Sequence, residues 1–191
     1  ELARRADLDF LLEVKSVDLG GGRNIIAAAI PFTGEPWNIL AKRAPVKSAV
    51  AFGSVLTLPA TGSEMNNGAV ITRRASNDKL AFSNSRLYPR FSVLDPTKTY
   101  TLPARQVANG VVDAFVHITE QYLTYPADAK VQDRFAEGLL LTLIEEGPKA
   151  LQEPENYAVR ANIMWTATLA LNGLIGAGVP NDWATHMLGH E

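Results

Sequence analysis

The sequence predicts two successive parts: an α/β part over residues 1–103 and an all-helical part over residues 104–191. Two observations support this division. Short runs of apolar and β-branched residues, separated by glycine and proline, fill the first hundred residues and are typical of strands between turns. From Pro103 onward, apolar residues recur at helical spacing. Strands mixed with short helices favour a layered α/β arrangement, in which we expect parallel strands.

The first part contains one expected helix and four expected strands. The helix is NIIAAAI (24–30), which ends before a proline. The strongest strand is SAVAFGSVLTLPA (48–60), which is rich in β-branched residues and is ended by proline. The other three expected strands are short apolar segments at 8–14, 69–74 and 90–95.

The second part is expected to hold four helices and no strand. They cover 103–124, 126–151, 154–178 and a segment that opens at Pro180. The second and third helices begin with proline at their first helical position, where its missing N–H costs no hydrogen bond. Asn181 or Asp182 is the expected N-cap of the fourth. Three glycines are expected to end the third helix: Gly173, Gly176 and Gly178.

Composition excludes several classes of function. The formal net charge is -2, with acidic and basic residues interspersed, so we expect no nucleic-acid partner and no membrane-surface partner. No run reaches the ~18 apolar residues of a membrane span. The absence of cysteine excludes disulfides and thiolate metal sites and fits a reducing compartment, so we expect a cytoplasmic protein. The first residue is Glu1, and we expect segments to be missing at both ends.

The three histidines are the residues with the clearest chemical meaning. Asp113 and His117 lie four residues apart, as do His186 and His190, so each pair would stack on one face of a helix. A buried aspartate is costly unless it is paired or bound to a cation. One carboxylate with imidazole nitrogens suits Zn²⁺ or Fe²⁺, short of a full shell by at least one ligand or water. The alternative is an ordinary hydrogen bond on a helix surface or in the core.

Two glycine-containing segments could contact a cofactor. In LTLPATGSEMNNGAVIT (56–72), small hydroxyl residues and glycine follow a strand, which suits close approach of a phosphate or ribose. An ordinary polar loop with a helix cap explains the same residues equally well. The second segment, DLGGGRN, is not a GxGxxG motif, and a flexible turn is the favoured interpretation of its glycines.

Three segments together resemble one family. They are LTLPATGSE, RQVANGVVDAFVHITEQY and GLIGAGVPNDWATHMLGHE. Their identity, order and spacing are similar to those of the iron-containing (group III) alcohol dehydrogenases, in particular the NADPH-dependent aldehyde reductase and butanol dehydrogenase branch. The resemblance covers roughly residues 8–191. It implies a dehydroquinate synthase-like architecture. Residues 1–103 would be part of a Rossmann-like dinucleotide-binding domain, residues 104–191 part of a helical metal-binding domain, and the active site would lie in the cleft between them.

The resemblance also assigns roles to the histidines. Asp113 and His117 match the first two metal ligands of the family, and His186 matches the third. The fourth ligand of the family is a histidine that would lie beyond Glu191. His190 matches a histidine near the nicotinamide and the substrate, and is therefore the expected catalytic residue for positioning or proton transfer.

Cofactor contacts are implied in the first part. Thr57, Thr61 and Asn66 fall in the segment that lines the cofactor, and Lys79 matches a lysine near it. The glycines that cradle the pyrophosphate correspond to Gly20, Gly21 and Gly22. Here they come late, after Lys15, Ser16 and Asp18, which departs from the family pattern. The expected cofactor is NADP(H), with NAD not excluded, together with one divalent metal ion, Fe²⁺ or Zn²⁺.

The resemblance thus implies an alcohol/aldehyde oxidoreductase, acting as a homodimer on small aldehydes or alcohols. Hydride would pass between the nicotinamide and a metal-polarised substrate. Two alternatives stay open at this point. One is a non-catalytic or incomplete fragment of such an enzyme. The other is a dehydroquinate synthase-like lyase, although those enzymes carry glutamate where this chain has Asp113.

Overall fold

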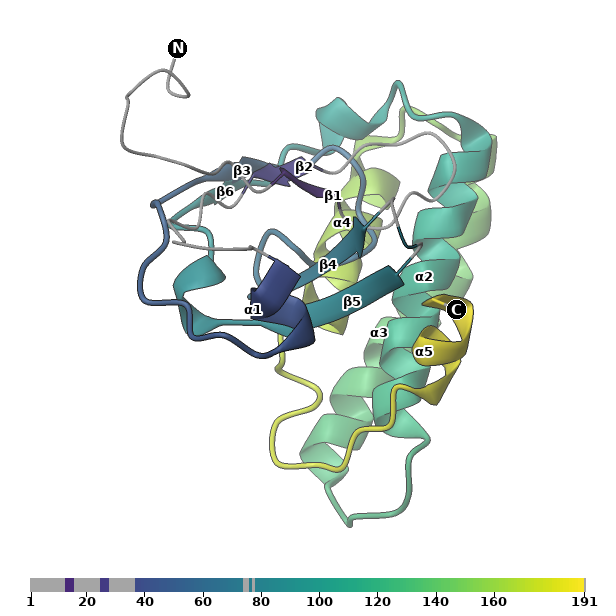
Figure 1. Ribbon diagram of the computed structural model, residues 1–191. Coiled ribbons are helices and arrows are strands. Elements are labelled where there is room, and N and C mark those ends of the chain that lie inside the picture. Colours follow the sequence, from purple (N-terminus) through teal and green to yellow (C-terminus); the bar gives the residue numbers. More distant parts are fainter. Residues whose placement is uncertain (1–12, 16–24, 28–36, 74–75, 77, 191) are drawn as a thin grey trace.

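The computed structural model describes residues 13–15, 25–27, 37–73, 76 and 78–190. Within these residues the protein is mostly helical, with few and short strands. Figure 1 shows the strands gathered on one side and the long helices α2, α3 and α4 on the other, with the short helix α5 lying across α2. The change from strands to helices comes after the 3₁₀ helix η3 (Pro96–Thr99).

The strands pair two by two. β1 (Glu13–Lys15) and β2 (Ile25–Ala27) are antiparallel, β3 (Ser54–Val55) and β6 (Ser92–Val93) are parallel, and β4 (Gly68–Arg73) and β5 (Asp78–Ser83) are antiparallel. The strands expected at 69–74 and 90–95 are therefore confirmed in essence. A strand over 78–83 was not expected from the sequence.

The expectation of parallel strands is wrong for two of the three pairs. Only four residues separate Arg73 from Asp78 in the sequence. A parallel pairing needs a crossover of a dozen or more residues, whereas a short connection allows only a hairpin. β4 and β5 accordingly pair along their full length, from Gly68 opposite Ser83 to Arg73 opposite Asp78.

Two further expectations in this part are corrected. The helix expected at 24–30 contains the strand β2, which pairs with β1 through Val14 and Ile26. A short apolar run fits either a buried helix or a strand, and here the partner segment decides. The strand expected at 48–60 is reduced to β3, because regular strand persists only beside β6, where the backbone N–H of Leu56 reaches the Val93 carbonyl at 3.0 Å.

The described residues from 104 onward form four helices and no strand, as expected. They are α2 (Ala104–Tyr122), α3 (Lys130–Gln152), α4 (Tyr157–Ala170) and α5 (Ala184–His190). The other helices are α1 (Trp37–Ala41) and the 3₁₀ helix η2 (Ser85–Leu87). No helix among the described residues is both long and apolar enough to cross a membrane.

Helix α4 ends earlier than the expected residue 178. Its last carbonyls are capped by side chains from elsewhere in the chain: Gln121 Nε2 donates to the Ala170 carbonyl at 2.8 Å, and Asn66 Nδ2 donates to the Leu171 carbonyl at 3.3 Å. The chain then turns at Gly173, whose φ of 92° is in the left-handed region that favours glycine. These caps close the helix eight residues before its apolar pattern ends.

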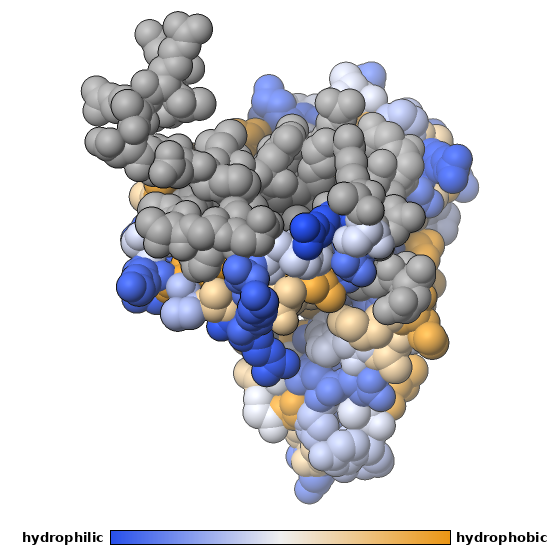
Figure 2. All heavy atoms as spheres, viewed as in Figure 1, coloured by the Kyte–Doolittle hydropathy of each residue, from blue (hydrophilic) through white to orange (hydrophobic). Residues whose placement is uncertain are grey.

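The helices pack through two clusters of buried residues. One joins α2, α3 and α4 around Ala114, Ile118, Leu143 and Ala167, and the second lies closer to the start of α2. In the space-filling view, apolar residues also gather on the outer surface of the helical side (Figure 2). A third cluster, under β4 and α1, belongs to the first part of the chain.

Candidate metal centre and cavity

Asp113 and His117 lie one turn apart on α2 and face the same side, as their spacing predicts. His117 is 4% exposed. Its Nε2 lies 3.8 Å from Asp113 Oδ1, which is beyond hydrogen-bonding distance. Its other ring nitrogen, Nδ1, is buried and makes no hydrogen bond of normal geometry within the described residues.

His186 joins this pair from α5, although it follows His117 by 69 residues in the sequence. Its Nε2 lies 3.7 Å from Asp113 Oδ1, and ligand atoms of all three residues lie within 4.8 Å of one another. Bonds of ~2.0–2.2 Å to a tetrahedral ion place neighbouring ligand atoms roughly 3.3–3.6 Å apart. The structure therefore brings Asp113, His117 and His186 together at nearly the spacing that one ion requires.

The two imidazoles lie in different electrostatic surroundings. Burial lowers the pKa of His117, although the Asp113 carboxylate acts in the opposite direction. Interaction with Asp113 raises the pKa of His186, and Glu120 acts in the same direction. The rings stack with centroids 4.5 Å apart, so two protonated imidazoles would repel each other strongly. A neutral pair beside one carboxylate is the arrangement that a divalent cation would complete.

Two residues of this site were missed by reasoning from sequence. Glu120 contacts the His186 ring through its carboxylate. Trp183 stands edge-on to both imidazoles, with centroids 6.3 Å from His117 and 5.8 Å from His186. The spacing of Glu120 was a signal that could have identified it. Glu120 follows Asp113 by seven residues and His117 by three, which puts all three on the same face of a helix.

A cavity of about 620 Å³ opens beside these side chains. Asp113, His117 and His186 form one wall, and the opposite walls come from the 61–70 segment and from β5. Several apolar residues line it: Phe82, Leu171, Trp183 and Met187. The volume is within the usual range for a small-molecule site, and an apolar lining with a few convergent polar groups is typical of one.

The residues expected to contact a cofactor divide into three groups. Thr61 and Asn66 line this cavity, whereas Thr57 and Lys79 are not among its lining residues. Thr57 is exposed in the turn after β3, and Lys79 lies on β5. Gly20, Gly21 and Gly22 lie outside the described residues. The backbone of His190 closes α5, one turn after His186, and its side chain is also outside the described part.

Asn66 is already committed to internal hydrogen bonds. Its Nδ2 donates to the Thr61 carbonyl at 2.9 Å and to the Leu171 carbonyl at 3.3 Å, and its Oδ1 accepts from Gly68 N at 3.1 Å. Asn66 therefore ties the 61–68 loop to the end of α4. Thr61 differs, because its hydroxyl is buried at the cavity and makes no hydrogen bond within the described residues, which leaves it able to bind a polar ligand atom.

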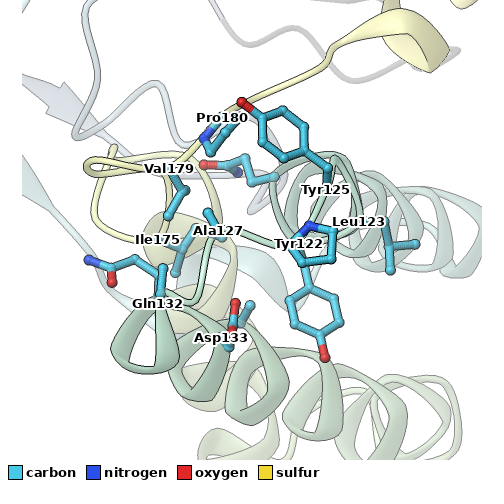
Figure 3. A pocket seen from close by; sticks show the side chains of 13 residues that line it. Tyr122, Leu123, Tyr125, Ala127, Gln132, Asp133, Ile175, Val179 and Pro180 are labelled. Carbon is cyan, nitrogen blue, oxygen red and sulfur yellow. The ribbon is translucent and has the colours of Figure 1, made fainter.

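A second cavity, of about 320 Å³, lies where α2 ends and α3 begins. Figure 3 shows the side chains around it, which include Tyr122, Tyr125, Gln132, Ile175, Val179 and Pro180. None of the residues predicted for cofactor, metal or catalysis lines this cavity. The larger cavity is therefore the candidate site.

The chemistry of the donor set fits a metal ion. One carboxylate and two imidazoles are hard and borderline donors of the kind that Zn²⁺ and Fe²⁺ take. Nε2 of His117 and Nε2 of His186 lie 3.8 Å and 3.7 Å from Asp113 Oδ1, and this spacing leaves room for an ion among the three donor atoms. Apolar walls on one side and buried packing on the other would keep such an ion partly shielded from water.

Comparison with known proteins places the chain in a family. Residues 14–96 match the family described as iron-containing alcohol dehydrogenase, and residues 107–191 match the C-terminal part of the Fe-containing alcohol dehydrogenase family. The chain belongs to the iron-containing alcohol dehydrogenases. The family that the sequence resembles is thus confirmed.

Several individual members of the family are similar to this chain. The chain is 64% identical, over all of its length and 50% of the relative's, to the NADPH-dependent aldehyde reductase YqhD of Escherichia coli. It is 42% identical to the probable NADH-dependent butanol dehydrogenase 1 of Bacillus subtilis, covering 99% of this chain and 49% of that protein. The crystal structure of Escherichia coli YqhD superposes with a TM-score of 0.82 and 69% identity, over 84% of this chain and 41% of that one. The chain spans about half the length of the curated relatives it matches.

Proposed function

We propose that the protein is a metal- and NADP(H)-dependent alcohol/aldehyde oxidoreductase, with the reacting groups in the 620 Å³ cavity. The observation that carries this proposal is the meeting of Asp113, His117 and His186 at the wall of that cavity. Family membership supports it, because the relatives named above are an aldehyde reductase and a butanol dehydrogenase. Small aldehydes and alcohols are the proposed substrates.

In this proposal Asp113, His117 and His186 hold one Zn²⁺ or Fe²⁺ ion. Bound there, the ion supplies a Lewis acid for the substrate oxygen. The protein does the rest of the positioning. Trp183 and Met187 line the cavity next to His186, exclude water and offer an apolar surface to the carbon chain of an aldehyde or alcohol.

The nicotinamide cofactor is proposed to enter from the side of the strands. NADP(H) supplies or accepts the hydride. Thr61 lies on that side of the cavity with a buried hydroxyl that could bind a polar cofactor atom, and Asn66 holds the surrounding loop in shape. We propose NADP(H) over NAD because the relative at 64% identity is named NADPH-dependent, whereas the relative at 42% is named NADH-dependent.

The finer architecture belongs to the same proposal. Residues 1–103 would be part of a Rossmann-like dinucleotide-binding domain and residues 104–191 part of a helical metal-binding domain, in a dehydroquinate synthase-like arrangement. The change from strands to long helices at η3 supports this boundary. Gly20, Gly21, Gly22, Thr57 and Lys79 remain proposed cofactor contacts on the basis of the family resemblance.

Metal binding tests the centre of the proposal. The purified 191-residue chain should bind one Zn²⁺ or Fe²⁺ per chain by elemental analysis, and the complete gene product should oxidise NADPH in the presence of an aldehyde only when loaded with metal. Asp113→Asn should abolish both. Asp128→Asn, on the exposed loop before α3, is the matched control and should change neither. Full activity of Asp113→Asn, or of the metal-free enzyme, would contradict the proposal.

His190 is the proposed proton-transfer residue. It follows His186 by one turn in α5, and an imidazole has an ordinary pKa suited to proton transfer near neutral pH. In the complete enzyme, His190→Ala should keep its metal while turnover falls by ~10²–10⁴-fold, as is typical for the loss of an acid–base group. Loss of the metal together with activity would show that His190 is instead a ligand.

The assembly is proposed to be a homodimer in the cytoplasm. Apolar side chains exposed on α3, including Val131, Leu141 and Ile144, support a contact with a further protein surface. Light scattering after size-exclusion chromatography should give the mass of two chains for the complete protein, and a monomer at micromolar concentration would contradict this part of the proposal.

A further inference from the structure

Glu120 connects helix α2 to helix α5. Its side chain is only 7% exposed. One carboxylate oxygen, Oε1, accepts a hydrogen bond from the His186 backbone N–H at 3.0 Å, and the other, Oε2, contacts Nδ1 of the same residue's ring. The first N–H groups of a helix lack an intrahelical acceptor, and His186 is the third residue of α5. Glu120 therefore holds both the backbone and the ring of one residue.

The ring contact has a chemical consequence. A carboxylate beside Nδ1 favours the tautomer that carries its proton there, because a carboxylate only accepts hydrogen bonds. The lone pair of a neutral imidazole is then left on Nε2. That is the atom that lies 3.7 Å from Asp113 Oδ1, on the side where the three ligand atoms converge.

His186 needs such support more than His117 does. His117 is fixed within the long helix α2 and is almost fully buried. His186 comes from a helix of seven residues that follows a stretch without regular structure. A second hydrogen bond joins the segments next to these helices without touching the ring: the Asp182 N–H, just before α5, donates at 3.1 Å to Thr124 Oγ1, just after α2.

We propose that Glu120 is a positioning residue for the metal centre, which fixes the tautomer and direction of the His186 ring so that Nε2 meets the ion. This inference rests on the metal centre proposed above. Acceptors of this kind behind a metal-bound histidine orient the ring, and their loss typically weakens metal affinity by ~10–100-fold. Glu120 would thus act on the ion through His186, without contacting the ion itself.

Glu120→Gln is the decisive variant, because the side chain keeps its size. One amide oxygen can still accept from the His186 N–H, but the NH₂ group then faces Nδ1 and favours the opposite tautomer. We expect Zn²⁺ affinity, measured by competition with a chromophoric chelator, to fall ~10–100-fold. We expect the melting temperature of the metal-free chain to change by less than ~2 °C, because the backbone hydrogen bond is retained.

Two control variants separate positioning from general support. Thr124→Val removes the tie to Asp182 and the hydroxyl's hydrogen bond to the Glu120 backbone carbonyl but leaves the ring contact, and Glu145→Gln removes an exposed carboxylate from α3. Both should keep the Zn²⁺ affinity of the unaltered chain. A drop in affinity for Thr124→Val as large as that for Glu120→Gln would overturn the proposal, since anchoring α5 would then explain the effect.

A second readout does not depend on metal. Long-range ¹H–¹⁵N spectra of the metal-free chain, at a pH where the imidazoles are neutral, should show His186 with its proton on Nδ1, and Glu120→Gln should move it to Nε2. The same tautomer in both proteins would overturn the role of Glu120. If the tautomer moves as expected but the unaltered chain binds no Zn²⁺, the proposed function fails while the positioning of the ring by Glu120 stands.

Discussion

The helical bundle and the strand-bearing region build opposite walls of one cavity, yet they are packed differently. In the bundle, Ala114, Ile118 and Ala167 are fully enclosed between α2, α3 and α4. Among the described residues of the strand-bearing region, one cluster of five buried residues lies under β4 and α1, and β5 has only exposed and half-buried positions. The three ligand candidates all come from the helical side. The helical side thus supplies the candidate ligands, and the strand-bearing side supplies the facing walls of the cavity.

The two regions meet through few but specific contacts. Gly110 of α2 lies so close to the Pro59 carbonyl that an added Cβ would stand 2.5 Å from it. Asn66 binds the Leu171 carbonyl, and the buried Glu64 contacts Thr168 of α4. These three contacts hold the 59–66 loop against the bundle next to Asp113 and His117.

The largest effect is expected in the core of the bundle. Ile118 is 0% exposed and lies beside His117 on α2, so Ile118→Ala should lower the free energy of unfolding by ~2–5 kcal/mol. Val112→Ala, on the same helix but 60% exposed, should change it by less than ~0.5 kcal/mol. Urea unfolding followed by circular dichroism measures both. If Leu80→Ala, in the half-buried face of β5, proved as destabilising as Ile118→Ala, the contrast between the two regions would be wrong.

The next effect concerns the junction at Gly110. Alanine is favoured over glycine within a helix by ~1 kcal/mol, but at this position its Cβ would overlap the Pro59 carbonyl. We expect Gly110→Ala to destabilise the chain by ~1–3 kcal/mol, as overpacking does. Gly138→Ala is the matched control, because Gly138 lies inside α3 with nothing within 4 Å of its added Cβ. It should stabilise by ~0.5–1 kcal/mol. If both substitutions stabilised the chain, the 59–66 loop would have moved away from the added Cβ at no energetic cost.

The helices could be predicted from the sequence because the spacing of apolar residues that indicates a helix lies within the helix itself. Apolar residues at helical spacing placed α2 and α3 almost correctly. The prolines did not mark the first helical positions, because α3 begins four residues after Pro126 and α4 begins three residues after Pro154, where Asn156 is the N-cap. The ends of α4 and the pairing of β4 with β5 depend on distant partners, such as Gln121 and Asn66 for the former. The run 24–30 shows the same limit, since its composition fits helix and strand alike, and its partner at 13–15 decides.

The residues of the candidate site also differ in how far they could be predicted from the sequence. Asp113 and His117 share a helix face, so their spacing was informative on its own. The meeting of His186 with them could be expected only from the family resemblance, because the residues between them hold two long helices. Glu120 and Trp183 escaped notice since a glutamate on a helix is usually solvent-exposed and tryptophan is usually core. Only tertiary structure shows that both contact the histidines.

The smallest expected effect concerns the protonation of Glu64, whose burial raises its pKa above the ordinary value of 4.5. The arrangement of the neighbouring hydrogen bonds is compatible with a protonated carboxyl. Thr168 Oγ1 lies 3.0 Å from the Met164 carbonyl and also contacts Glu64 Oε1, yet a hydroxyl has one proton to donate. A protonated Glu64 satisfies both contacts by donating to Thr168, which then donates to Met164. The second oxygen, Oε2, is buried and makes no hydrogen bond within the described part of the chain, so a full charge there would be poorly solvated.

A pH series on Glu64→Gln tests this state, since the amide is a neutral mimic of the protonated acid. With a folded-state pKa above the unfolded value, the native chain retains a proton that the unfolded chain releases. The stability from Glu64 is thus present below about pH 4.5 and is lost as pH rises through the folded-state pKa. The variant should be within ~1 kcal/mol of the unaltered chain at low pH and should gain relative to it as pH rises. Subtracting the two unfolding free energies at each pH cancels the other titrating groups. A difference that stays constant with pH would mean that Glu64 is charged in the native protein and accepts a hydrogen bond from Thr168 as a carboxylate.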